Sequence, residues 1–298
     1  MRYNVYTAGI GRRAMSKILS FLMSAVMIFS YLLGFGSIKT DGGYTVVRTD
    51  KLNSVLSLYA AQGICYDGEN FYCSGAITAV NFTGLSKFDK EMNCLRVRTN
   101  AVPKEFTEKY GSNHIGGIDC ANGYIYAPVE GKVDGKYLYN FILLYDCKTL
   151  KYTGIYYDMS SGYLTDGIPW CAIDRENGYL YTSQFHNVGE ILQYDLETMT
   201  FLRAIPLEEK LDRIQGGSVY NGVLYLSYDA ANSTREQIIA VDPNTGSVRV
   251  EFTRYCPNYD NEAEDVCVYP MEDGSLFHVV DYDKLINANV SHYKPAEG

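Results

Sequence analysis

GICYDGENFYCSG, residues 63–75, consists of two apolar and aromatic runs joined by the turn sequence Asp67-Gly68-Glu69-Asn70. Asp, Gly and Asn favour tight turns, whereas β-branched and aromatic residues favour strands. The pattern recurs in GIDCANGYIYAPV from Gly117, AIDRENGYLYTSQ from Ala172, SVYNGVLYLSYD from Ser218 and DVCVYPMEDGSLFHVVD from Asp265. The first strands of the five copies begin about 46 to 55 residues apart, which is typical of the blades of a β-propeller.

Each of the first four repeats continues with a second pair of predicted strands. The second repeat has LLYDCKTLKYTGI and the fourth has IIAVDPNTGSVRVEF, in which an apolar strand ends at Asp and a short polar turn follows. The Asp side chain caps such a turn by accepting hydrogen bonds from the backbone that follows it. We therefore predict an all-β fold, a single β-propeller of about five four-stranded blades over residues 43–295. No long amphipathic helix follows residue 40, which weighs against an α/β fold.

The fifth repeat is short of one strand. After HVVDYD there is room for a single further strand, near Asn289 to Tyr293. The sequence GYTVVRTDKL, residues 43–52, has the composition of a strand and precedes the first repeat. We expect this N-terminal strand to close the last blade, which protects sheet edges that would otherwise be exposed.

The N-terminus predicts export. Residues 18–38 carry no charge and follow Arg2, Arg12, Arg13 and Lys17, as in a signal peptide. Residues 1–36 are therefore either a signal peptide, cleaved after Gly36, or a single-span membrane anchor, because the apolar run is long enough to cross a bilayer. Both alternatives make the protein extracytoplasmic, secreted in one case and membrane-anchored in the other.

The net charge limits the kinds of partner that we expect, and the cysteine content bears on whether disulfides form. The formal net charge of −9 argues against a nucleic-acid partner, because binding to phosphates needs an excess of Lys and Arg. The eight cysteines of an exported chain permit disulfides. Cys65 and Cys73 flank their turn symmetrically, so we expect them to face each other across the hairpin. The alternative is that most of the cysteines are small, buried apolar residues.

Residues 62–75, read from Gln62, resemble the opening blade of bacterial and plant glutamine cyclotransferases, which carry a QGL…DG…LY.S.G pattern. The resemblance implies a five-bladed propeller that forms pyroglutamate at peptide N-termini. This chain departs from the family at Ile214 to Ser218, where Gln215 replaces an acidic residue. Releasing ammonia needs proton transfers that a carboxylate performs and an amide does not. The resemblance therefore supports the fold more than the activity.

The residues directly before the innermost strands are expected to converge at one mouth of the central channel. We predict Glu264 and His114 as catalytic groups, acting as acid and base or as metal ligands; the alternative for His114 is a structural contact with a loop. The predicted binding residues are Gln62, Asp166, Trp170, Gln215 and Glu262. Trp170 is expected either to stack on a ligand or to plug the ring.

The acidic run at residues 260–265 offers the oxygen ligands that calcium prefers, and the alternative is a solvated acidic loop before a strand. A divalent cation such as calcium is therefore a possible cofactor, and the metal ligands stay unassigned. The first functional hypothesis is an extracytoplasmic propeller that binds a small ligand, peptide or glycan at its channel mouth. The alternative is a glutamine cyclotransferase-like acyltransferase or another propeller enzyme. A third hypothesis is an interaction scaffold that uses the propeller rim.

Overall fold

The computed structural model describes residues 38–298 except for 53, 230–234, 257–261, 284–286 and 297–298. The predicted signal or anchor at residues 1–36 lies outside this part. Among the described residues, no helix is both long enough and apolar enough to span a membrane.

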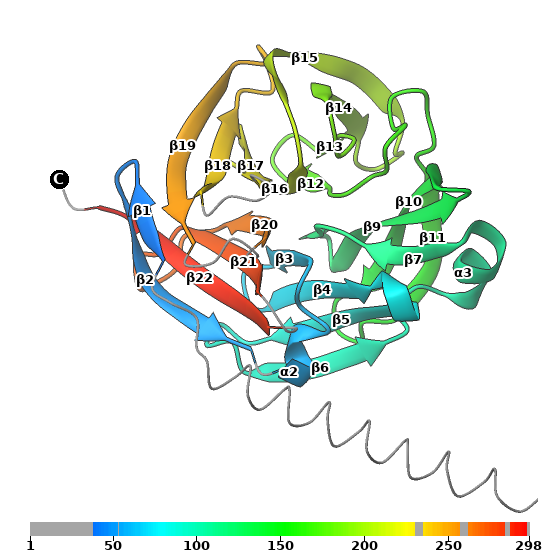
Figure 1. The fold of residues 1–298 in the computed structure, drawn as a ribbon, viewed down its shortest axis with the longest axis horizontal. Coiled ribbons are helices and arrows are strands. Elements are labelled where there is room, and N and C mark those ends of the chain that lie inside the picture. Colours follow the sequence, from blue (N-terminus) through cyan, green and yellow to red (C-terminus); the bar gives the residue numbers. More distant parts are fainter. Residues whose placement is uncertain (1–37, 53, 230–234, 257–261, 284–286, 297–298) are drawn as a thin grey trace, which may run out of the picture.

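Five antiparallel sheets surround a common axis in the described part of the chain (Figure 1). The first blade consists of β3 (Gly63–Tyr66), β4 (Phe71–Ile77), β5 (Phe82–Phe88) and β6 (Cys94–Thr99). The second consists of β7 (Ser112–Ile115), β8 (Asp119–Ala121), β9 (Tyr124–Val133), β10 (Lys136–Asp146) and β11 (Tyr152–Asp158). The third consists of β12 (Ala172–Asp174), β13 (Tyr179–Thr182), β14 (Val188–Asp195) and β15 (Phe201–Leu211). The predicted all-β, five-bladed propeller is confirmed.

The fourth and fifth blades complete the ring. The fourth consists of β16 (Ile214–Tyr220), β17 (Val223–Tyr228), β18 (Arg235–Val241) and β19 (Val248–Tyr255), and the fifth of β20 (Glu262–Val268), β21 (Phe277–Asp283), β22 (Asn287–Pro295) and β2 (Tyr44–Lys51). Because β2 pairs with β22, the N-terminal strand closes the last blade as expected. A strand that was not anticipated, β1 (Lys39–Asp41), extends the fourth blade beside β19.

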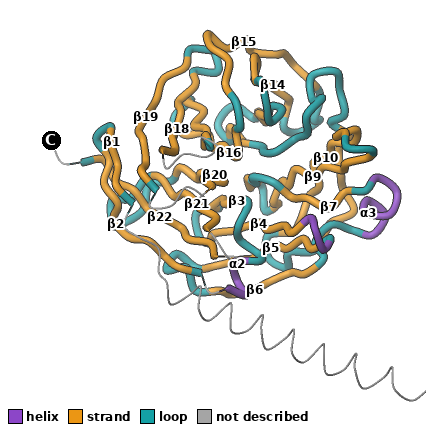
Figure 2. The backbone as a smooth tube through the Cα atoms, viewed as in Figure 1, coloured by secondary structure: helices purple, strands orange, loops and turns teal. Residues whose placement is uncertain are grey.

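Helices contribute little to the described structure, as Figure 2 shows. They are α2 (Ser54–Ser57), α3 (Lys104–Tyr110) and the 3-10 turn η1 (Thr78–Val80). The turns between strands follow the expected chemistry: Asp146 Oδ1 accepts hydrogen bonds from the backbone N–H and the hydroxyl of Thr149, at 2.8 and 2.6 Å. The Thr149 hydroxyl and backbone lower the pKa of Asp146, so the turn is stabilised by an ionised carboxylate.

The prediction that Cys65 and Cys73 face each other is wrong. In the β3–β4 hairpin, Cys65 is opposite Tyr72 and Cys73 is opposite Ile64. The two cysteines therefore occupy adjacent pairs, whose side chains point to opposite faces of the sheet. No two cysteine sulfurs are bonded among the described residues, which include all eight cysteines, and all of them except Cys94 are buried.

A buried carboxylate ties three blades together at the axis. Asp265 Oδ2 accepts hydrogen bonds from the backbone of Ile64 at 2.9 Å and of Ile118 at 3.1 Å, which belong to the first and second blades. A Cβ atom on Gly216 of the fourth blade would lie 1.9 Å from Asp265 Oδ1, so only glycine allows this approach. The inner strands are thereby fixed where they border the channel.

Candidate functional site

A cavity of about 680 Å³ lies where the innermost strands begin, and all five blades contribute to its wall. The predicted side chains that line it are Gln62, His114, Asp166, Gln215, Glu262 and Glu264. Their convergence follows from the repeat, because each lies within the six residues before an innermost strand or among the first three residues of one. The structure thus brings these six side chains together at one mouth and leaves Trp170 out of it.

Trp170 does not line the cavity. Its side chain is fully buried and its Nε1 donates a hydrogen bond to Ser183 Oγ at 3.1 Å. The indole ring packs so closely on Gly217 that a Cβ atom there would lie 3.0 Å from it. Trp170 thus fills the space between the third and fourth blades, which is the ring-plugging alternative rather than the ligand-stacking one.

A chain of hydrogen bonds links three of the predicted residues across three blades. Gln62 Nε2 donates to Glu264 Oε1 at 2.9 Å and to the carbonyl of Ala61 at 2.7 Å. With both amide hydrogens engaged, Gln62 Oε1 is left as an acceptor, and His114 Nε2 lies 2.5 Å from it. This arrangement assigns a hydrogen to His114 Nε2.

Glu130 extends this chain and was not predicted. His114 Nδ1 lies 3.2 Å from Glu130 Oε1, close enough for an ion pair although the two atoms are not aligned for a hydrogen bond. Glu130 Oε2 accepts a hydrogen bond from the backbone of Ile168 at 2.8 Å, and the carboxylate is buried. Glu130 lies in the middle of β9 and not before an inner strand, so the repeat pattern did not predict it as a site residue. The sequence feature that could have identified Glu130 is that it is the single acidic residue in the run YIYAPVEGKV, most of which is apolar.

The carboxyl groups of the fifth blade are electrostatically unusual. Burial raises the pKa of Glu264 well above its ordinary value, and the nearby carboxylates of Glu262 and Asp229 raise it further. Burial also raises the pKa of Glu262, followed by the effect of Asp229, although Arg213 opposes the shift. The protonated form of Glu264 is therefore favoured, which makes this side chain a hydrogen-bond donor as well as an acceptor.

Arg213 is a second unpredicted group in the cavity wall. Its Nε donates to Asp229 Oδ2 at 3.0 Å, and its Nη2 lies 4.0 Å from Glu262 Oε1. The guanidinium group stands 5.2 Å from the ring centroid of Phe185, which also lines the cavity. Because Arg213 directly precedes β16, the rule that selected Gln215 could have found it. The mouth thus combines carboxyl groups, a cation and an aromatic face.

The structure describes only part of the acidic run for which calcium was predicted. Asp260 and Asn261 of the acidic run lie outside the described residues. Within the described ranges, one group of potential metal ligands has its ligand atoms within 4.8 Å of one another, namely Cys65, Asp119 and Cys120. None of these three residues lines the cavity at the mouth.

Comparison with solved structures concerns the architecture. The chain resembles the β-xylosidase RS223, with a TM-score of 0.58 and 10% sequence identity over 82% of this chain and 94% of that one. It also resembles the GH43_1 enzyme from Xanthomonas citri complexed with xylose, with a TM-score of 0.52 and 12% identity over 83% and 90% of the two chains. What they share is the propeller fold. At these identities the likeness shows the fold alone.

No protein-family model matches the sequence. No curated protein matches it either. The resemblance of residues 62–75 to glutamine cyclotransferases is thus supported for the five-bladed fold, and its implied activity remains a hypothesis.

Proposed function

We propose that the protein is an extracytoplasmic propeller that binds a small, hydroxyl-rich ligand, a sugar or short glycan, in the cavity at the channel mouth. The observation that carries the proposal is the convergence of polar side chains from all five blades in a cavity of about 680 Å³ that also presents Phe185 and Tyr137. Cavities of roughly 300 to 1,000 Å³ with aromatic walls and a few placed polar groups are typical of ligand sites.

The mixture of donors and acceptors favours hydroxyl groups over a purely anionic or cationic ligand. A sugar hydroxyl both donates and accepts hydrogen bonds. The wall offers acidic side chains at Glu130 and Glu262, Glu264 with a raised pKa that favours its protonated form, and the guanidinium of Arg213. Phe185 adds an apolar face of the kind on which a sugar ring packs. The solved Xanthomonas citri enzymes, complexed with xylose and xylotriose, support the proposal by showing that a similar architecture accommodates sugars.

Titration calorimetry of the full chain with xylose, xylotriose and other neutral oligosaccharides tests this proposal. We expect saturable binding that Phe185→Ala and Glu262→Gln each weaken about tenfold, the scale for losing one buried contact in a binding site. Glu197→Gln is the matched control, because Glu197 is exposed in the outer turn of the third blade. Affinities that do not change in the cavity variants, or the absence of binding to any of the sugars, would contradict the proposal.

Catalysis is the second candidate function, and the state of Glu264 favours it. A buried carboxyl group with a raised pKa is suited to donate a proton to a leaving group, and the Gln62–His114–Glu130 chain fixes its surroundings. Two reactions fit such an acid. One is hydrolysis of a glycosidic bond, and the other is the cyclisation of N-terminal glutamine that the family resemblance implies.

Two assays separate these reactions: release of nitrophenol from aryl xylosides and arabinosides, and release of ammonia from peptides with N-terminal glutamine. In whichever assay shows turnover, Glu264→Gln is expected to lower kcat by about 10² to 10⁴, the usual contribution of a general acid. Glu197→Gln should leave the rate unchanged. Turnover that survives Glu264→Gln would contradict this role, and sugar binding without turnover in either assay would leave binding as the function.

A further inference from the structure

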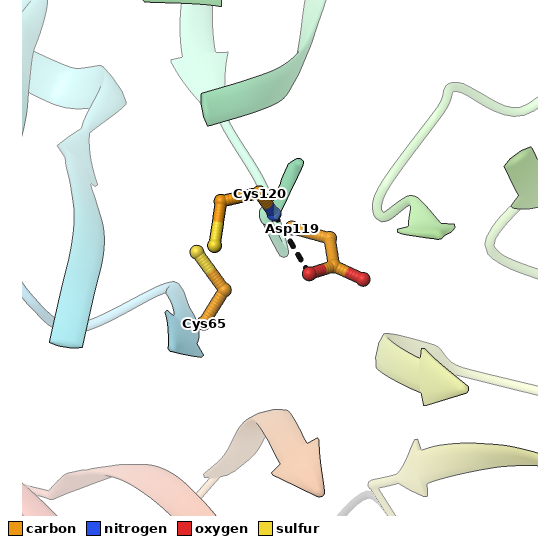
Figure 3. Close-up of side chains that lie close together, drawn as sticks. All are labelled: Cys65, Asp119 and Cys120. Carbon is orange, nitrogen blue, oxygen red and sulfur yellow. Dashed lines mark hydrogen bonds between the residues drawn. The ribbon is translucent and has the colours of Figure 1, made fainter. Parts of the chain in front are cut away.

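Two buried thiols from different blades point toward each other near the axis. Figure 3 shows Cys65 of β3 and Cys120 of β8 with their sulfur atoms turned together and Asp119 beside them. The two Sγ atoms and an Asp119 carboxylate oxygen lie within 4.8 Å of one another. Both cysteines belong to the apolar core between the first and second blades, with Tyr72 and Leu85 among its other members.

The backbones that carry these thiols are held together independently of sulfur. Ile64, next to Cys65, and Ile118, two residues before Cys120, donate their N–H groups to the same oxygen, Asp265 Oδ2. A Cβ atom on Gly63 would lie 2.8 Å from the carbonyl oxygen of Gly116. The two chain segments are therefore in close contact just before they reach the cysteines.

A metal ion fits this group poorly. Asp119 Oδ2 accepts a hydrogen bond from the backbone of Ile173 at 2.8 Å, and Oδ1 accepts from Cys120 N at 2.7 Å and from Arg175 Nη2 at 2.5 Å. The guanidinium of Arg175 also lies 3.8 Å from Cys120 Sγ, where it would repel a cation. A disulfide carries no charge and suits an apolar core.

We propose that Cys65 and Cys120 form a disulfide that joins the first and second blades in the mature protein. The reaction needs an oxidant, which is the disulfide of an external thiol–disulfide exchange partner. The thiolate of one cysteine attacks that disulfide to give a mixed disulfide, and the thiolate of the other displaces it. One S–S bond forms between Cys65 and Cys120, and the partner leaves as two thiols after taking up the protons. Because both thiols are buried afterwards, the exchange takes place while the two blades are still folding.

The disulfide would change the free energy of unfolding of the protein, and it would not change which ligands bind at the channel mouth. It closes the chain from Cys65 to Cys120 and so restricts the unfolded state, to which disulfides owe much of their effect in the chain-entropy model. It crosses an interface between blades at which apolar side chains pack and at which Asp265 and Ser74 provide buried hydrogen bonds. The proposal is independent of what binds at the mouth.

Labelling of the cysteine thiols in the wild-type full chain tests whether the disulfide between Cys65 and Cys120 forms. The chain is refolded in a glutathione redox buffer, denatured in N-ethylmaleimide and weighed by mass spectrometry. We expect two fewer labels than the eight cysteines, and a non-reduced digest in which the peptide of Cys65 is linked to that of Cys120. Reduction should lower Tm by about 5 to 10 °C. Cys73→Ser should keep the link, whereas every remaining cysteine of Cys65→Ser should be labelled.

Three outcomes would overturn the proposal. Eight labels on the refolded wild-type chain would show that the pair stays reduced. A link from Cys65 to any cysteine other than Cys120 would show that the pairing is wrong. A stoichiometric metal ion found by elemental analysis of fully reduced protein, and lost from Cys65→Ser, would make the group a metal site instead.

Discussion

Arg254→Met is expected to lower the free energy of unfolding by about 3 to 5 kcal/mol, the cost of breaking a buried ion pair by removing one partner. Arg254 of β19 and Asp281 of β21 are both fully buried. Two hydrogen bonds join the guanidinium to the carboxylate, at 2.6 and 3.0 Å, and a third reaches the Tyr293 hydroxyl at 3.0 Å. The pair fastens the fourth blade to the fifth. Without the arginine, the Asp281 carboxylate loses the cation that opposes its burial among the described residues.

Urea denaturation of the full chain measures this effect. Arg249→Met is the matched control on the same strand, because Arg249 is exposed where it pairs with Glu251 and such a pair contributes at most about 1 kcal/mol. The double variant Arg254→Met/Asp281→Leu should be more stable than Arg254→Met alone, since it removes the uncompensated charge together with its partner. Equal losses in Arg254→Met and Arg249→Met would contradict the assignment.

The blades could be predicted from the sequence because each is a local pattern. The alternating strands and the Asp-based turns recur within a few tens of residues, so the repeat and the missing strand of the fifth blade were both visible. β1 was not, because Lys39–Asp41 is short and polar and carries no strand pattern. Contacts between blades, such as the Arg254–Asp281 pair, were equally hidden. They depend on how the sheets pack around the axis, and neither residue departs from its own repeat.

The candidate site was predictable to the extent that it follows the repeat. Gln62, His114 and Glu264 occupy equivalent places before or at the start of inner strands, so one rule finds them. Glu130 reaches the same cavity from β9, and its role depends on the cross-strand pairing of His114 with Glu130. The rule also put Trp170 at the mouth, but its side chain turns into the interface between blades. The sequence predicted that Trp170 lies just before an inner strand, and it did not predict the direction in which the indole ring points.

Acid is expected to weaken the closure of the ring through a buried histidine pair. His278 of β21 and His292 of β22 are cross-strand neighbours with 2.6 Å between their Nδ1 atoms. His278 Nε2 lies 2.8 Å from the Tyr269 carbonyl, and His292 Nε2 lies 2.9 Å from Asp50 Oδ2 of the closing strand β2. Burial and, after it, the electrostatic effect of His292 lower the pKa of His278 from 6.5 to about 3. The pair therefore ties β2 into the last blade with His278 neutral.

The sign of the effect follows from proton uptake. Between pH 6.5 and 3 an unfolded chain protonates His278 and the folded chain does not, so lowering the pH favours unfolding. At about 1.4 kcal/mol per pH unit, the loss from this group between pH 6.5 and pH 4 is roughly 3 kcal/mol. The charged groups that bear on the pair are Asp50, Arg48 and Asp273, of which Arg48 opposes protonation of His278 and Asp273 favours it.

Urea denaturation at pH 7, 5.5 and 4 tests this for the wild type, His278→Gln and His186→Gln. The buried carboxyl groups of Glu264 and Asp265 have raised pKa values, which act on stability in the opposite direction as the pH falls. The informative quantity is therefore the difference in pH dependence between the wild type and a single variant. Glutamine in place of His278 takes up no proton in the unfolded state, so the stability of His278→Gln should fall less steeply toward pH 4. His186 is exposed, so His186→Gln should follow the wild type. If both variants keep the wild-type slope, the His278–His292 pair is not what makes the closing blade sensitive to acid.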